Sequence, residues 1–301
     1  MPIPRRTPLI TLMRLEAKHV AILNRILAEA VKELDAQIAR MGAENPITVM
    51  QARAQRAAMA DFLNQTFDNM EDVTRRGMAE AASAASRVVS RYEAEILKLV
   101  LDQQMLNQLA SSESIRAAAG LEAALKRIQG TSYKPLADTV YGTKNIASGW
   151  VDDIINRALA SGWSRQRLAA ELRKSIDPNV AGGVSYAANR TARTEINNAF
   201  HSISAERYMN SILVEGVDWN LSSSHPEGDI CDTLADESPY DKRKVPHKPH
   251  PNCYCFITPV LPTDDEFLDK LFNGDYDDAN WAEQAAATGG QIRLGGTFMA
   301  R

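Results

Sequence analysis

The residues best suited to chemistry lie in one short polar segment. All three cysteines of the chain and three of its five histidines fall between residues 225 and 255. Thiolate and imidazole are the preferred ligands of Zn²⁺, and a structural zinc site needs four of them in a tetrahedral arrangement. The spacing allows one half-site at His225 with Cys231 and another from two of His247, His250, Cys253 and Cys255. The set that we carry forward, with structural zinc as its cofactor, is His225, Cys231, His250 and Cys253.

A metal-free interpretation of this segment stays open. The chain has no C-x-x-C pair, because no second cysteine follows Cys231 at that spacing. Cys253 and Cys255 would point to opposite faces of an extended strand, so at most one of them is expected in a single site. In the metal-free alternative, Asp229 and Asp232 cap turns and the cysteines are small buried apolar groups.

The sequence around the cysteines does not indicate catalysis. Cysteine, histidine and aspartate together can form a thiol nucleophile with its base. No glycine-rich elbow or oxyanion loop surrounds Cys231 or Cys253, however, and the chain has neither a phosphate-cradling loop nor an H-E-x-x-H helix. We therefore expect that the chain is not an enzyme.

A group of cations in the same segment is a candidate for nucleic-acid contact. The group consists of Lys242, Arg243, Lys244 and Lys248. Four clustered cations can neutralise phosphates without reading bases, although a solvated loop is the alternative. The whole chain carries a net charge of −4, which argues against a general nucleic-acid coat.

The elements that must position this segment are mostly helices. Apolar residues recur at steps of three and four from Val20 to Met41, and similar runs cover 51–70 and 78–109. Gly42 and Pro46 separate the first two runs. Two interpretations of this N-terminal region, residues 1–130, remain: a self-contained bundle, or an arm that docks on a portal or another large assembly.

The second half of the chain changes from helices to short strands. Turn signals at Gly130, Pro135 and Gly142 predict a linker over 131–144. Helices are predicted at 150–160, 165–176 and 186–210, and strands at 212–214, 217–221 and 254–260. Residues 145–262 form the predicted second domain, and 263–301 an acidic C-terminal tail. The expected fold class is mainly α with a small α+β C-terminal domain.

The sequence also limits the compartment. No window reaches the roughly 18 consecutive apolar residues of a membrane-spanning helix, and the N-terminus lacks the apolar core of a signal peptide. Three cysteines, two of them separated by one residue, make a poor disulfide framework. We therefore expect no membrane contact and synthesis in a reducing cytoplasm.

Several of these residues occur in an order that resembles a known family. The order is Arg193-Thr194-Glu195 on a helix, Trp219 on a strand, His225, Asp229 and Cys231, and finally His250-Pro251-Asn252-Cys253-Tyr254-Cys255. It is similar to the head-morphogenesis domain of phage minor head proteins of the Mu F type, over about 145–260. The closing His-Pro-Asn-Cys-x-Cys is the most specific part of the match. Two departures are Tyr254, where the family usually has arginine, and the single cysteine at 231.

The resemblance implies a structural role in a virion. Proteins of this family belong to the head of a tailed phage or prophage, at the portal vertex or in the inner head, and act in capsid assembly, DNA packaging or ejection. The implied partners are the portal protein and other head proteins, with several copies per virion assembled in the host cytoplasm and a contact with phage DNA. The alternative is a metal-stabilised DNA-binding module delivered with the genome. Within the motif, we expect Arg193 and Glu195 to orient their helix through charge-assisted hydrogen bonds to the loop or the backbone.

Overall fold

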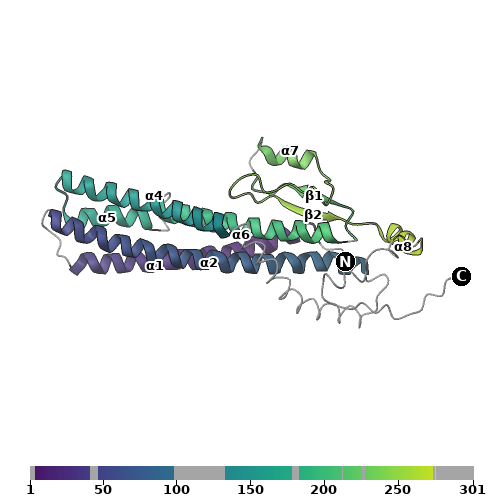
Figure 1. Ribbon diagram of the computed structural model, residues 1–301, viewed down its shortest axis with the longest axis horizontal. Helices are drawn as coiled ribbons and strands as arrows, with labels where there is room; N and C mark the ends of the chain where they lie inside the picture. Colours follow the sequence, from purple (N-terminus) through teal and green to yellow (C-terminus); the bar gives the residue numbers. More distant parts are fainter. Residues whose placement is uncertain are drawn as a thin grey trace, which may run out of the picture. The chain divides into compact units, whose positions relative to one another are not determined.

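The computed structural model describes residues 4–40, 47–97, 133–177, 183–211, 213–225, 228–273 and 275 (Figure 1). Within these ranges the chain is mostly helical and has a small antiparallel sheet near its C-terminal end, which confirms the predicted fold class. The helices are α1 (Thr7–Arg40), α2 (Val49–Leu97), α4 (Tyr133–Ala160), α5 (Arg165–Ile176), α6 (Gly183–Asn210), α7 (Ile230–Asp236) and α8 (Asp264–Phe272). The strands are β1 (Gly216–Asn220) and β2 (Phe256–Val260). None of the helices that the structure describes combines the length and apolar character needed to span a bilayer.

The chain divides into two compact units, and neither is continuous in sequence. Among the described residues, the helical unit comprises 13–78 and 133–197, and the sheet unit comprises 4–12, 79–97 and 198–275. Helices α2 and α6 contribute residues to both units, because each is long enough to bury different turns in different cores. The predicted domains, by contrast, were contiguous stretches of sequence, and their boundaries stay predictions.

The helical unit buries the apolar stripes that its sequence predicts. On α1 the fully buried positions include Leu23 and Leu27, and on α2 they include Met59, Leu63 and Phe67. Residues of α4, α5 and α6 complete this core, and they include Ile155, Leu172, Val184 and Ile196. The α1 stripe is thus satisfied inside the chain. Near its start, Ile10 and Met13 are exposed, and the arm interpretation with its portal contact stays a prediction.

Polar pairs accompany this packing in the helical unit. The carboxylate of Glu16 on α1 is buried, and its Oε1 lies 3.0 Å from Nε of Arg193 on α6. Nδ2 of Asn189 donates to Oδ1 of Asn24 over 2.8 Å, which links the same two helices. Arg56 on α2 pairs with Asp152 on α4 at 2.6 Å. The first two contacts link α6 to α1, and the third, between exposed side chains, links α4 to α2.

Two predicted interruptions of helices are wrong. The runs 51–70 and 78–109 belong to one helix up to Leu97, and residues 98–109 lie outside the described ranges. The predicted linker at 131–144 is largely helical, since α4 begins at Tyr133. Pro135 is its third residue, where the backbone N–H has no partner inside the helix, so the missing donor costs nothing.

The sheet unit is built around two short strands that lie side by side (Figure 1). Strands β1 and β2 pair antiparallel, with Trp219 opposite Ile257. Val217 on β1 exchanges backbone hydrogen bonds with Tyr240, which attaches the loop between α7 and β2 to strand β1. The predicted strand at 212–214 is absent from the described part, 213–214, whereas the predictions at 217–221 and 254–260 are confirmed to within two residues.

The core of the sheet unit is unusual in containing every cysteine of the chain. Its buried members are Val89, Tyr208, Val214, Val217, Trp219, Cys231, Cys253, Cys255 and Ile257. A second cluster joins Ile96 and Leu213 to Phe267 of α8. Helix α8 starts with a capping box in which Thr263 and Glu266 exchange hydrogen bonds, so the first part of the predicted acidic tail is helical. Residues 276–301 of that tail lie outside the described ranges.

Candidate metal centre

The first arm of the candidate site is the start of helix α7. Oδ1 of Asp229 accepts a hydrogen bond from the backbone N–H of Cys231 over 2.6 Å, and Oδ2 of Asp232 accepts one from the N–H of Asp229 over 2.9 Å. Together these contacts form a capping box, as expected for an acidic N-terminal turn. The predicted capping by both aspartates is therefore confirmed. The cap holds Cys231 in the first turn with its side chain fully buried.

The second arm is the loop that leads into β2. Nε2 of His201, on α6, donates to the carbonyl of Pro246 over 2.8 Å. Further along, the Lys248 ammonium donates to the carbonyls of Cys253 and Cys255. Asn252 has a φ of 58°, in the left-handed region that asparagine tolerates better than most residues. The loop thus turns at Asn252, and hydrogen bonds from His201 and Lys248 anchor it.

This turn brings the last two cysteines close to the other donors, one in each of the two sets that could hold a metal ion. Strand β2 begins at Phe256, so the period-two alternation of a strand does not apply to residues 253–255. Both Cys253 and Cys255 are buried in the same core cluster as Cys231. Cys255, which the sequence-based metal set omitted, is therefore a potential ligand.

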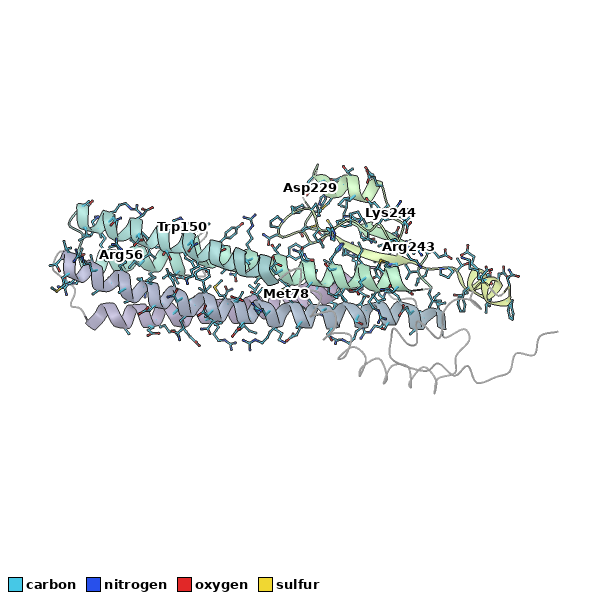
Figure 2. The ribbon with its side chains drawn as sticks, viewed as in Figure 1. Arg56, Met78, Trp150, Asp229, Arg243 and Lys244 are labelled. Atoms are coloured by element: carbon cyan, nitrogen blue, oxygen red, sulfur yellow. The ribbon has the colours of Figure 1, made fainter. Side chains whose placement is uncertain are left out.

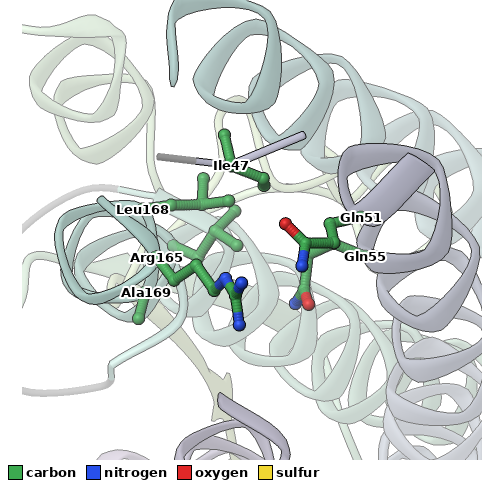
Figure 3. Close-up of a pocket in the computed structure, with 7 residues that line it drawn as sticks. Ile47, Gln51, Gln55, Arg165, Leu168 and Ala169 are labelled. Carbon is green, nitrogen blue, oxygen red and sulfur yellow. The ribbon is translucent and has the colours of Figure 1, made fainter. Parts of the chain in front are cut away.

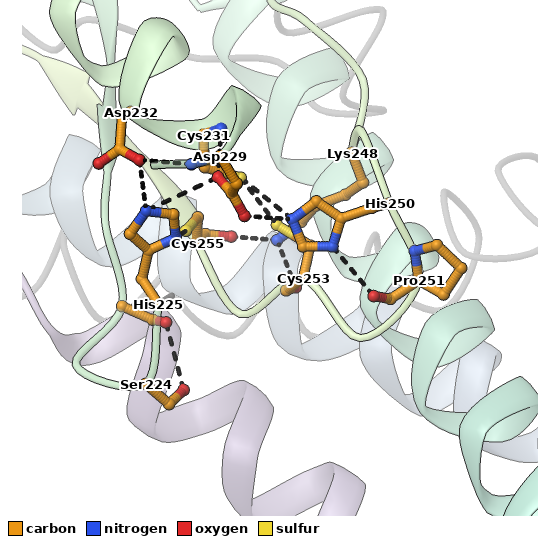
Figure 4. A network of polar contacts seen from close by, with 11 residues as sticks. Ser224, His225, Asp229, Cys231, Asp232, Lys248, His250, Pro251, Cys253 and Cys255 are labelled. Carbon is orange, nitrogen blue, oxygen red and sulfur yellow. Dashed lines mark hydrogen bonds and ion pairs between the residues drawn. The ribbon is translucent and has the colours of Figure 1, made fainter. Parts of the chain in front are cut away.

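Three distances between donor atoms are close to the edges of a tetrahedral zinc site (Figure 4). The Cys231 sulfur lies 3.6 Å from the Cys253 sulfur and 3.4 Å from Nε2 of His250. The Cys255 sulfur lies 3.7 Å from Nδ1 of His225. Zn–S bonds of about 2.3 Å and Zn–N bonds of about 2.0–2.1 Å at tetrahedral angles give edges of about 3.8 Å between sulfurs and about 3.6 Å between sulfur and nitrogen.

Five soft donors are thus available to a metal ion. They form two overlapping sets, one of His225, Cys231 and Cys255 and the other of Cys231, His250 and Cys253. Within each set all ligand atoms lie within 4.8 Å of one another. The cluster could hold a metal, and it contains every member of the predicted set. His247, the remaining histidine of the segment, is exposed and belongs to neither set.

Each histidine of the cluster presents one ring nitrogen to the sulfurs while its other nitrogen is hydrogen-bonded. Nε2 of His225 donates to Oδ2 of Asp232 over 3.0 Å, which leaves Nδ1 facing Cys255. Nδ1 of His250 lies 3.0 Å from the carbonyl of Pro251, and its Nε2 lies 3.4 Å from the Cys231 sulfur and 3.2 Å from Oδ2 of Asp229. Metal-ligating histidines are held in this way, because an oxygen acceptor fixes the tautomer and the ring orientation.

The thiols of this core are poorly suited to ionise by themselves. Burial raises the pKa of Cys231 to about 12, and a hydrogen bond with the Cys253 thiol, together with burial, raises the pKa of Cys255. The pKa of Cys253 is lowered by its hydrogen bond with Cys255 and by the positive charge of Lys248. A bound divalent cation reverses this balance, since it deprotonates coordinated thiols. Without one, Cys231 and Cys255 stay protonated at neutral pH and are weak nucleophiles.

The other residues of the motif serve different contacts. Trp219 on β1 makes an edge contact with the His201 ring at 5.5 Å and helps to build the core. Arg193 and Glu195 belong to the helical unit. Arg193 pairs with Glu16 of α1 and not with the loop. No residue in the described ranges donates a hydrogen bond to the half-buried Glu195, and burial raises the pKa of its carboxyl.

Two of the four cations proposed for phosphate contact are engaged elsewhere. The Lys242 ammonium donates to the carbonyl of Ser211 over 2.7 Å, and the Lys248 ammonium is bound by the two cysteine carbonyls. Arg243 and Lys244 remain exposed (Figure 2). The DNA-binding alternative therefore keeps two of its four candidate residues.

A small cavity in the helical unit offers no competing site. It lies between α2 and α5, is lined by residues such as Gln51, Gln55, Arg165 and Leu168, and has a volume of about 10 Å³ (Figure 3). This is the size of a single water molecule. The cavity is too small for a substrate.

Comparison with known proteins finds no relative: no family model, no curated protein and no solved structure matches the chain significantly.

Proposed function

We propose that residues 213–260 form a structural zinc module. The observation that carries this proposal is the convergence of five soft donors from two separate loop segments at spacings that suit tetrahedral Zn²⁺. A bound ion would cross-link the start of α7 to the loop before β2. Coordinated zinc would also supply the charge that makes buried thiolates favourable. The metal-free interpretation accounts for the burial of the cysteines and for the pairs that the two histidines form with Asp229 and Asp232. A metal ion would in addition account for the ring nitrogens that face the sulfurs.

We further propose that the protein is a structural minor head protein of a tailed phage or prophage. It would act at the portal vertex or in the inner head, in several copies, with the portal protein and other head proteins as partners. The proposal is supported by the clustering of the motif residues between 225 and 255. Residues that match the family's motif in sequence are therefore also neighbours in the fold. The buried, protonated thiols favour this structural role over nucleophilic catalysis.

Co-purification of the full chain with its portal protein tests the second proposal. The portal protein encoded in the same genome is immobilised, the full chain is passed over it, and zinc is measured in the retained sample. We expect stable retention and one zinc ion per chain. His250→Ala should reduce the zinc content, whereas His247→Ala, which changes an exposed histidine of the same loop, should not.

Retention on the portal protein and zinc content test the two proposals independently. A chain that carries zinc but is not retained would exclude the portal-vertex role and leave the zinc module standing. A chain that is retained without zinc would exclude the module and leave the head role standing.

A further inference from the structure

A tetrahedral ion needs four of the five donors, and the possible sets differ in charge. Two thiolates and two neutral imidazoles around Zn²⁺ give a net charge of zero. Three thiolates and one imidazole give a net charge of −1. The surrounding charges therefore distinguish between the sets, because an uncompensated charge in this core is costly. This step rests on the zinc module proposed above.

One ammonium group lies directly against the ligand loop. Nζ of Lys248 donates to the backbone carbonyls of Cys253 and Cys255, the two cysteines of the loop (Figure 4). It also lies 6.0 Å from the centre of the Trp219 ring, in the range of a cation–π contact.

The other charged groups near the cluster do not take the place of this ammonium. His201 stays neutral, because burial, followed by the charge of Lys248, lowers its pKa to about 3. The carboxylates of Asp229 and Asp232 have exposed fractions of 25% and 40% and interact with the start of α7 and with the histidines. Water and backbone N–H groups thus stabilise their charge, whereas the Lys248 ammonium has two carbonyls and an aromatic ring.

We infer that the ion is held by the thiolates of Cys231, Cys253 and Cys255 with one imidazole, and that Lys248 is the counter-charge of this centre. With three thiolates, the centre and the ammonium together have a net charge of zero. With two thiolates, the ammonium would lie uncompensated beside a neutral site. Lys248 is also a positioning residue, because its two hydrogen bonds hold the backbone of two ligands in one turn. Three sulfurs favour zinc over cations that prefer oxygen ligands.

The number of thiolates can be measured directly in the full chain loaded with Co²⁺ in place of zinc. The absorption from thiolate-to-cobalt charge transfer, scaled per bound ion, reports how many sulfurs coordinate. Cys255→Ser should lower this intensity by about one third, from three sulfurs to two, and should weaken zinc binding in competition with a chelator. An unchanged intensity and affinity in Cys255→Ser would establish the two-thiolate set and overturn the inference.

Lys248 is tested with charge-removing and charge-keeping variants. Lys248→Met should weaken zinc binding by about 10–100-fold, as outer contacts of metal sites typically do when removed. Lys248→Arg keeps the charge and should retain most of the affinity. Lys244→Met removes an exposed lysine of the same loop and should bind zinc as the unmodified chain does. Circular dichroism shows that the helices of each variant are folded.

Each remaining outcome is decisive. Wild-type affinity in Lys248→Met overturns the role of the lysine. If Lys248→Met does not fold, the folded Lys248→Arg variant decides. A loss of zinc affinity of about 10–100-fold in this variant, which keeps the charge, would overturn the role of the lysine as a counter-charge. A wild-type chain that binds neither cobalt nor zinc overturns both this inference and the zinc module. Failure to bind the portal protein affects neither, because metal binding is measured on the isolated chain.

Discussion

At the scale of single residues, the candidate metal centre depends on groups that are not ligands themselves. Asp232 accepts hydrogen bonds both from Nε2 of His225 and from the backbone N–H of Asp229. It therefore connects the cap of α7 to the orientation of one imidazole. The hydrogen bond lowers the pKa of Asp232 and raises that of His225, so the pair favours a charged carboxylate beside the ring.

Asp232→Asn should weaken zinc binding while the chain stays folded. The amide still fits the cap, but it lacks the negative charge that makes the imidazole a better ligand, so we expect a loss of about tenfold in affinity. Competition with a chelator measures this. Asp236→Asn makes the same change at an exposed position of the same helix and should have no effect. Equal affinities of the two variants would show that Asp232 serves the helix cap alone.

The site was predictable from sequence only as far as residue types reveal it. The gathering of cysteine and histidine between 225 and 255 indicates a cluster, because few other arrangements bring these types together. The sequence-based metal set omitted Cys255, since the alternation rule assumes an extended strand where the chain turns at Asn252. Lys248 resembled a solvated cation, and only the fold shows that it is bound by carbonyls.

At the scale of elements, the helices were predictable because the positions that are apolar in the sequence are the positions that the helices bury. The errors are the division of α2 into two runs and the linker predicted from Gly130, Pro135 and Gly142. Gly77 lies inside α2, and a Cβ atom at this position would come within 2.5 Å of the Ile196 side chain and 3.1 Å of His19. The glycine thus permits close approach of α1 and α6 to α2 within the helical unit.

Gly77→Ala should therefore destabilise the protein, although alanine is the better helix former. The helix gains about 1 kcal/mol from alanine, whereas overpacking a filled core costs about 1–3 kcal/mol, so we expect a net loss of up to about 2 kcal/mol. Urea unfolding measures the change. Gly149→Ala, on α4 with no atom within 4 Å of the added carbon, should stabilise by up to about 1 kcal/mol. A gain at both positions would mean that Ile196 moves aside freely.

At the scale of the whole molecule, the two units differ in how they are stabilised. The helical unit buries long apolar stripes from five helices. The described residues of the sheet unit form two strands of five residues each, and its core includes three cysteines. A two-stranded sheet is marginally stable by itself. Sequence periodicity could not reveal this difference, because it reports which faces are apolar and not how much each core encloses.

Removal of the metal should therefore unfold the sheet region selectively. Structural zinc contributes about 10–16 kcal/mol in small zinc domains, which is comparable with the total stability of a typical domain, about 5–15 kcal/mol.

Hydrogen exchange of the full chain, followed by mass spectrometry with and without a chelator, measures the effect on each segment. We expect the amides of β1 and β2 to lose protection and those of residues 13–31 and 49–78 to keep it. Added zinc should restore protection, whereas Mg²⁺, which prefers oxygen ligands, should not. Unchanged exchange in β1 and β2 after complete removal of the metal would mean that the cysteines and histidines stabilise this region by packing and hydrogen bonds alone.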